Sequence, residues 1–172
     1  MEDVARACGV GKGTLYRYFP SKRALYSALI LDGMDQLRSE LEAAAAGPAA
    51  PLARLERAVR AALEHFRNRR FLLALLHRQE HKPSRDEVRE WEGRRKRLLE
   101  VLGGTLQAAM DGGQLRSTDP EIAAELLLAL LRSVDRRRRP RDAAEDLVAS
   151  VIELFLCGVG TAKGQRAWRA ET

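Results

Sequence analysis

Residues 1–25 of the chain read MEDVARACGVGKGTLYRYFPSKRAL. A short segment, residues 2–8, is separated from a second one, residues 12–19, by Gly9-Val10-Gly11. Glycine readily adopts the left-handed backbone conformation that ends a helix, so this pattern predicts two short helices joined by a tight turn. Such a pair of helices is typical of a helix-turn-helix. We call residues 1–22 the reading head.

The second predicted helix carries an outer surface that is unusually aromatic and basic. Leu15 and Phe19 are four residues apart, so they share one face and are expected to point inward. The remaining faces suit a DNA groove, because phenol and ammonium groups reach phosphates, Thr and Arg reach base edges, and glycine permits close backbone approach. We therefore predict a DNA-binding surface made of Lys12, Gly13, Thr14, Tyr16, Arg17 and Tyr18. Lys22 follows at the start of the next helix, where a phosphate could bind.

The rest of the chain predicts an all-α fold. Apolar residues recur at spacings of three and four throughout, and no sustained alternation of two residues is present. Capping residues and prolines indicate longer helices that begin near residues 21, 51, 84, 119 and 142. The apolar run 71–76 is expected to be a buried helix, and residues 161–172 are expected to be a polar tail.

Composition excludes several classes of protein. The chain has 172 residues and a net charge of +6, with 30 basic against 24 acidic side chains, which favours an anionic partner. Only 5% of residues are aromatic, which argues against a β-sandwich or barrel. No apolar run approaches the ~20 residues of a membrane span, so no membrane partner is expected. Cys8 and Cys157 form no metal-ligand cluster, and Cys8 is expected to be a buried small residue. We expect a reduced, cytoplasmic protein without cofactors.

Residues 2–25 resemble the DNA-binding signature of the tetracycline-repressor (TetR) family of bacterial regulators. The match is nearly gapless over about two dozen positions, which makes it a specific signal. The resemblance implies an all-α homodimer whose N-terminal domain reads double-stranded operator DNA and whose C-terminal domain binds a small-molecule effector and dimerises. We expect the corresponding domains to be residues 1–46, which include a linker helix, and residues 47–172, which we call the body.

The resemblance also implies roles for individual residues. Lys12, Thr14, Tyr16 and Tyr18 match the DNA-contacting positions of the family, and Lys22 matches its phosphate-contacting lysine. Gly13 and Arg17 occupy the variable face, where they would tune sequence preference. Val10, Leu15 and Phe19 match core positions of the DNA-binding domain.

The sequence departs from the family pattern at its start. Family members carry another amphipathic helix before this motif, whereas the present sequence begins at the motif's first helix. That helix packs on Val4, Val10, Leu15 and Phe19, and uncovering them would cost about 1.5–3 kcal/mol for each large side chain. Two hypotheses follow: a ligand-responsive regulator, expected to be a repressor on a pseudo-palindromic operator, and a helical dimeric sensor or interaction protein with a defective reading head.

Two apolar helices near the end of the chain favour dimerisation through a helix bundle. The predicted dimer interface consists of Leu126, Leu127, Leu130, Leu131, Leu147, Val151 and Phe155. The predicted lining of a ligand pocket consists of His65, Phe66, His77 and Trp91.

Two further patterns have alternative interpretations. His77, Glu80 and His81 spell H-x-x-E-H, which would suit a zinc hydrolase, but no third ligand is evident and polar residues near a helix end are the simpler interpretation. We therefore predict neither a metal site nor an enzyme. The run Arg136–Arg139 suits a solvated loop beside a helix C-terminus better than a second nucleic-acid surface.

Overall fold

The structure is a computed structural model that describes residues 1–69, 84–137 and 144–171. All regular elements in these ranges are helices, which confirms the predicted all-α class. The helices are α1 (Glu2–Ala7), α2 (Lys12–Tyr18), α3 (Lys22–Ala45), α4 (Pro51–Asn68), α6 (Arg85–Asp111), α7 (Pro120–Arg137), α8 (Ala144–Val159) and α9 (Ala162–Glu171).

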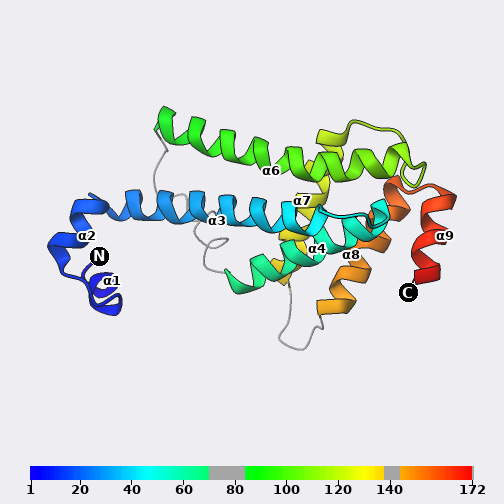
Figure 1. Cartoon of the computed structure of the whole chain (residues 1–172). Helices are drawn as coiled ribbons and strands as arrows, with labels where there is room; N and C mark the ends of the chain where they lie inside the picture. Colours follow the sequence, from blue (N-terminus) through cyan, green and yellow to red (C-terminus); the bar gives the residue numbers. More distant parts are fainter. Residues whose placement is uncertain (70–83, 138–143, 172) are drawn as a thin grey trace.

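The helices form two unequal groups along α3 (Figure 1). The short helices α1 and α2 lie at one end of α3, beyond the other helices. The remaining length of α3 packs against α4 and α6, and α7 and α8 complete the bundle. α9 lies at the far end of the molecule from α1 and α2.

Side-chain caps begin the helices where the sequence predicts them. The Ser21 hydroxyl accepts a hydrogen bond from the Ala24 N–H at 3.1 Å, at the start of α3. Asp119 Oδ1 accepts from the Glu121 N–H at 2.8 Å, and Pro120 occupies the first position of α7. Each cap satisfies a backbone donor that has no partner within its helix.

The main hydrophobic core lies in the body and includes only the second half of α3. Leu37 and Leu41 of α3 belong to it with Leu115 of the α6–α7 connection, and α4, α6, α7 and α8 supply the other members. Among the described residues, the large side chains that are most completely buried are Leu41, Leu55, Val59, Leu102, Leu106, Leu115, Leu127, Leu131, Val148, Val151, Ile152 and Leu156. Four buried apolar residues near the N-terminus are not part of this core. They are Ala5 and Leu15 in the reading head, and Leu25 and Leu31 in the first half of α3.

Two expectations from the sequence are wrong. Residues 162–171 form helix α9 rather than a polar tail, because Thr161 caps it: the Thr161 hydroxyl accepts from the Gly164 N–H at 3.2 Å. The same hydroxyl donates to the Gly113 carbonyl at 2.7 Å, which fastens α9 to the turn after α6. Cys8 is exposed rather than buried, because it lies past the last residue of α1 and faces solvent.

Some predicted features fall outside the described residues. The apolar run 71–76, His77, Glu80 and His81 lie between α4 and α6 in the range 70–83. The side chains of Arg136–Arg139 also lie outside the described set. In the described parts of the chain, no helix is both long and apolar enough to cross a membrane.

Candidate nucleic-acid interface

The predicted helix-turn-helix is present. Gly9 has a φ of 67°, the left-handed conformation that the sequence predicts for the end of α1. The turn is closed by hydrogen bonds from the Gly9 N–H to the Arg6 carbonyl at 3.2 Å and from the Val10 N–H to the Ala5 carbonyl at 3.0 Å. These bonds reverse the chain within three residues, so that α2 packs against α1.

The apolar content of the reading head is small. Ala5 and Leu15 are buried, with exposed fractions of 4% and 8%, whereas Phe19 is half-buried. Val4 and Val10, which are predicted to need a covering surface, are 38% and 40% exposed. The inward direction of Leu15 fixes the rotation of α2 and thereby turns the opposite face outward.

The predicted DNA-binding residues are all accessible. Each of them is exposed, and Tyr18, at 68%, is more open than Tyr16, at 40%. The surface consists of Lys12, Gly13, Thr14, Tyr16, Arg17, Tyr18 and Lys22. The Arg17 guanidinium lies 5.2 Å from the centre of the Tyr18 ring, and the Lys22 ammonium lies 5.3 Å from that of Tyr26. Cation–π contacts of this kind orient long side chains without burying them.

The charge of this surface favours an anion. The first 30 residues contain five cations and two carboxylates, so they account for half of the net charge of +6. Lys12 forms an ion pair with Glu2, which raises the pKa of the Lys12 ammonium and lowers the pKa of the Glu2 carboxyl. Both groups are exposed, so this ion pair can readily be exchanged for one between Lys12 and a phosphate.

Gly13 exposes the backbone in the middle of this surface. A Cβ atom added there would meet no protein atom within 4 Å, and the φ of Gly13 is not positive. Neither packing nor backbone conformation within the chain therefore requires a glycine, although glycine disfavours a helix by roughly 1 kcal/mol relative to alanine. An incoming surface that must approach the helix backbone closely would explain the residue.

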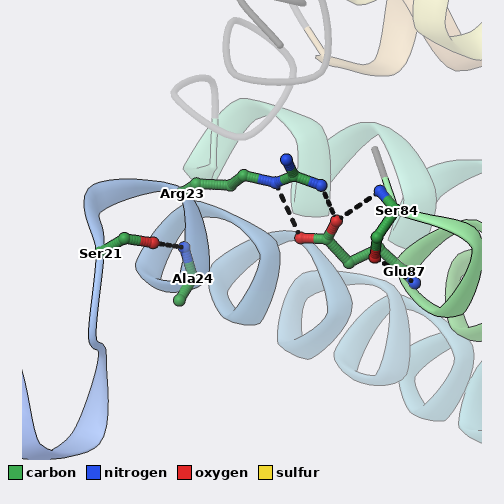
Figure 2. Close-up of polar contacts among 5 residues, drawn as sticks. All are labelled: Ser21, Arg23, Ala24, Ser84 and Glu87. Atoms are coloured by element: carbon green, nitrogen blue, oxygen red, sulfur yellow. Dashed lines mark hydrogen bonds and ion pairs between the residues drawn. The ribbon is translucent and has the colours of Figure 1, made fainter. Parts of the chain in front are cut away.

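An ion pair joins the start of α3 to the start of α6 (Figure 2). The Arg23 Nε donates to Glu87 Oε1 at 3.0 Å, and Arg23 Nη2 donates to Glu87 Oε2. Glu87 also belongs to a capping box: its Oε2 accepts from the Ser84 N–H at 2.8 Å, and its own N–H donates to the Ser84 hydroxyl at 3.2 Å. Arg23 and the Ser84 N–H together lower the pKa of the Glu87 carboxyl to about 2.

Sequence reasoning identifies only half of this contact. The spacing of Ser84 and Glu87 predicts the capping box, but nothing local indicates a partner for Arg23. The two charges are 64 residues apart, so only the packing of α3 on α6 brings them together.

The predicted dimer residues divide into buried and exposed groups. Leu127, Leu131, Val151 and Phe155 are buried in the core of the single chain, so their side chains are not available to a partner. Leu130 and Leu147 are partly buried against that core, and Leu126 is 60% exposed. Ile122 and Leu154, which the prediction does not include, are 57% and 63% exposed. Apolar spacing alone does not separate such an outer position from an inner one.

The predicted pocket residues lie in two places. His65 and Phe66 are buried residues of α4, and their rings meet edge to face with centres 6.0 Å apart. The His65 Nδ1 lies 2.9 Å from Glu40 Oε2. Trp91 lies on α6, where the Arg95 guanidinium is 5.7 Å from its ring centre. Among the described residues, no group of three or more His, Cys, Asp or Glu side chains could hold a metal ion.

The comparisons with known proteins agree with this geometry. Residues 1–29 match the family model described as "Bacterial regulatory proteins, tetR family", and residues 48–159 match that described as "Tetracyclin repressor-like, C-terminal domain". The chain is 25% identical over 162 residues to the "Uncharacterized HTH-type transcriptional regulator YhgD" of Bacillus subtilis, which covers 91% of this chain and 83% of that protein.

Solved structures share the fold. A regulatory protein of the tetR family from Rhodococcus RHA1 superposes with a TM-score of 0.79 at 21% identity, covering 94% of this chain and 86% of that one. AibR, solved in complex with isovaleryl coenzyme A and operator DNA, superposes with a TM-score of 0.70 at 20% identity, covering 88% and 84%.

His65 makes the stability of the body dependent on pH. Burial lowers the pKa of the His65 imidazole below its ordinary value of 6.5, and Glu40 opposes the shift. Below about pH 6.5, His65 binds a proton in the unfolded chain more readily than in the folded chain, because its pKa is lower in the folded chain. The free energy of unfolding therefore decreases as the pH falls. We expect His65→Gln to reduce the difference between urea unfolding measured at about pH 7.5 and at about pH 5.5. An unchanged difference would contradict this role of His65.

Proposed function

We propose that this chain, which belongs to the tetR family of bacterial regulatory proteins, is a ligand-responsive repressor. In this proposal it binds a pseudo-palindromic operator as a homodimer. Membership of this family makes the chain a DNA-binding transcriptional regulator, since the family consists of regulators rather than enzymes. Repression, response to an effector, the operator and the homodimer are the parts that we propose.

The observation that carries the proposal is that α2 turns only Leu15 inward. Lys12 and Tyr16 lie on one side of Leu15 and Thr14 and Tyr18 on the other, and all four are exposed. A helix of this length enters a major groove, where hydroxyl and cationic groups reach phosphates and base edges. Lys22 adds a cation at the start of α3, within reach of the backbone that flanks the groove.

We propose that residues 1–46 read the operator and that residues 47–172 bind the effector and dimerise. The position of the core supports a separate reading head, because the main apolar cluster contains no residue before Leu37; Leu37 and Leu41 join the linker helix α3 to the body. The arrangement in Figure 1 supports it as well, since α1 and α2 lie beyond the bundle at the end of α3.

The exposed apolar face of α7 and α8 supports the homodimer. Ile122 and Leu126 are four residues apart on α7, and Leu154 lies on α8, which contacts α7. Three large apolar side chains, each more than half exposed, favour a surface that a second copy covers. In a two-fold dimer the two α2 helices would enter successive major grooves about 34 Å apart.

The proposed effector is a small molecule that binds within the body. AibR shows the same fold in complex with isovaleryl coenzyme A and operator DNA. His65 and Phe66, two consecutive buried residues of α4, are among the lining residues that we propose. An effector needs only to favour a conformation that misfits the operator, and a coupling of about 1–3 kcal/mol changes occupancy several-fold or more. Binding to DNA would place the protein in the cytoplasm.

Salt dependence tests the DNA-binding proposal. If each protomer neutralises about five phosphates, the logarithm of the affinity should fall with the logarithm of the salt concentration with a slope near −9. We expect Lys12→Ala to reduce the magnitude of that slope by about 2 in a dimer. Fluorescence anisotropy on a duplex selected by the protein from a random pool measures both. Lys96→Ala, which removes an exposed cation from the body, is the control. A slope near zero would favour the hypothesis of a defective reading head.

Gly13→Ala should change stability and DNA affinity in opposite directions. The methyl group finds open space in the free protein, so the substitution should stabilise α2 by about 1 kcal/mol. On DNA the same methyl group would hold the helix away from the groove, so affinity should fall by about tenfold or more. Thermal unfolding and anisotropy measure the two effects. Gly104→Ala, at an equally open site on α6, should stabilise the protein without affecting DNA. Unchanged affinity of Gly13→Ala would exclude close approach at this residue.

Charged residues on the proposed dimer face should separate the protomers. Leu126→Arg together with Leu154→Arg would place two cations per chain on the surface that a second copy covers, and desolvating them opposes association. Sedimentation velocity should change from the mass of a dimer to that of a monomer. Gln107→Arg, at an exposed position on α6, should remain dimeric. A double variant that still sediments as a dimer would remove α7 and α8 from the interface.

A further inference from the structure

We infer that Arg23 and Glu87 are positioning residues for DNA binding: their ion pair holds the end of α3 that bears the reading head against the first turn of α6. The inference rests on the proposed DNA-binding function and adds to it a contact that places the reading head relative to the body. Neither residue belongs to the predicted DNA-binding surface.

The need for such a contact follows from where apolar packing begins. From Lys22 to Leu37, the first α3 residue in the main core, there are fifteen residues, or roughly 22 Å of helix. Leu25 and Leu31 are buried on this length but lie outside that core. Apolar burial in the main core therefore fixes the second half of α3, while the reading head is attached to the first half. A small tilt of the first half would displace α2 relative to a DNA groove.

Ion pairs between α3 and α6 are placed where they oppose such a tilt. Within the described ranges, two pairs join these helices: Arg23 with Glu87, and Arg94 Nε with Asp35 Oδ2 at 2.9 Å. The second pair is only two residues from Leu37, where the core already holds α3. Among the described side chains, Arg23 alone provides an ion pair between the first 30 residues and the body.

The geometry of the pair makes it more restrictive than an ordinary surface salt bridge. Two N–H groups on one edge of the Arg23 guanidinium, at Nε and Nη2, meet both oxygens of Glu87, an arrangement that fixes the planes of both groups. The capping box independently orients Glu87, since its Oε2 also accepts from the Ser84 N–H (Figure 2). A flexible ion pair loses side-chain entropy when it forms. Here the hydrogen bond from the Ser84 N–H already restricts the Glu87 carboxylate, so less entropy is lost when Arg23 binds it.

The pair also gives two adjacent cations, Lys22 and Arg23, different partners. Lys22 and Arg23 are consecutive on α3, so their side chains leave the helix in directions about 100° apart. Arg23 points to α6 in Figure 2, and its charge is met by Glu87. Lys22 lies over the Tyr26 ring, and its ammonium remains exposed for a phosphate.

α6 is suited to transmit movement from the body through this pair. Its neighbouring residues Arg94 and Arg95 bind different helices, Arg94 holding Asp35 of α3 and Arg95 holding Glu125 of α7. α7 also carries part of the proposed dimer face. A shift of α6 therefore moves its first turn, and Glu87 carries that shift to Arg23 beside the reading head.

Glu87→Gln is the decisive variant because charge and positioning predict opposite results. Glutamine keeps the capping-box side chain but removes the carboxylate that fixes Arg23. Removing a negative charge strengthens DNA binding if only long-range electrostatics matters. We expect instead about 3- to 10-fold weaker binding to the selected duplex, because both protomers lose the pair. Asp86→Asn, which removes the same charge from an exposed residue in the same turn, is the matched control and should not weaken binding.

The spacing of the half-sites supplies a readout that a loss of stability would not change. For the wild type, inserting or deleting one base pair between half-sites should abolish tight binding. Glu87→Gln should bind the original and altered duplexes more nearly alike, because a less constrained head tolerates misplacement. Arg23→Lys, which keeps the charge but not the bidentate contact, should lie between wild type and Arg23→Gln. Equal losses on every spacing, or stronger binding by Glu87→Gln, would overturn the inference.

A measurement without DNA separates this inference from the proposed function. Spin labels at cysteines introduced for Arg6 and Gln107, with Cys8 and Cys157 replaced by serine, report the distance from the reading head to α6. Labelled chains are diluted into unlabelled protein so that distances within one chain are observed. Glu87→Gln should broaden the distribution, and an unchanged distribution would overturn the inference even if the protein binds DNA. If no duplex is selected while the distribution broadens, the proposed function fails and the positioning contact stands.

Discussion

The burial of the second half of α3 between α4 and α6 is the constraint on which the rest of the structure depends. Leu37 and Leu41 anchor that half in an apolar core shared by five helices, where each large side chain contributes roughly 1.5–3 kcal/mol. The first half of the same helix carries the reading head beyond the bundle. One continuous helix thus belongs to both parts, and any change in its orientation within the core is a change in the placement of α2.

Polar contacts add to the apolar packing by fixing the orientation of α3 against α4 and α6. The α3–α4 contact includes the buried His65 with Glu40, and the α3–α6 contact includes Asp35 with Arg94. The Arg23–Glu87 pair extends this seam toward the reading head, where the main core no longer reaches. Directional contacts suit this task, because a hydrogen-bonded pair specifies an orientation whereas apolar contact mainly specifies proximity.

Local chemistry made much of the fold and of the candidate site predictable. Gly9 ends α1 in the left-handed conformation, and Ser21, Ser84 and Asp119 begin helices, because each acts on backbone groups a few residues away. The outward face of α2 followed from the four-residue spacing of Leu15 and Phe19. The Arg23–Glu87 pair was not predictable, since it depends on the crossing of two distant helices. The exposure of Leu126 and the burial of Leu127 could likewise be learned only from the packed bundle, because α7 is apolar over a wide arc.

The sparse interior of the reading head has a thermodynamic consequence. Ala5 and Leu15 are its buried apolar side chains among the described residues, so local opening of α1 and α2 requires much less free energy than global unfolding. Their amide protons should exchange with solvent well before those of α4 or α7. A duplex that seats α2 would also quench these fluctuations, and the association would then carry the enthalpy, entropy and heat-capacity signature of ordering coupled to binding.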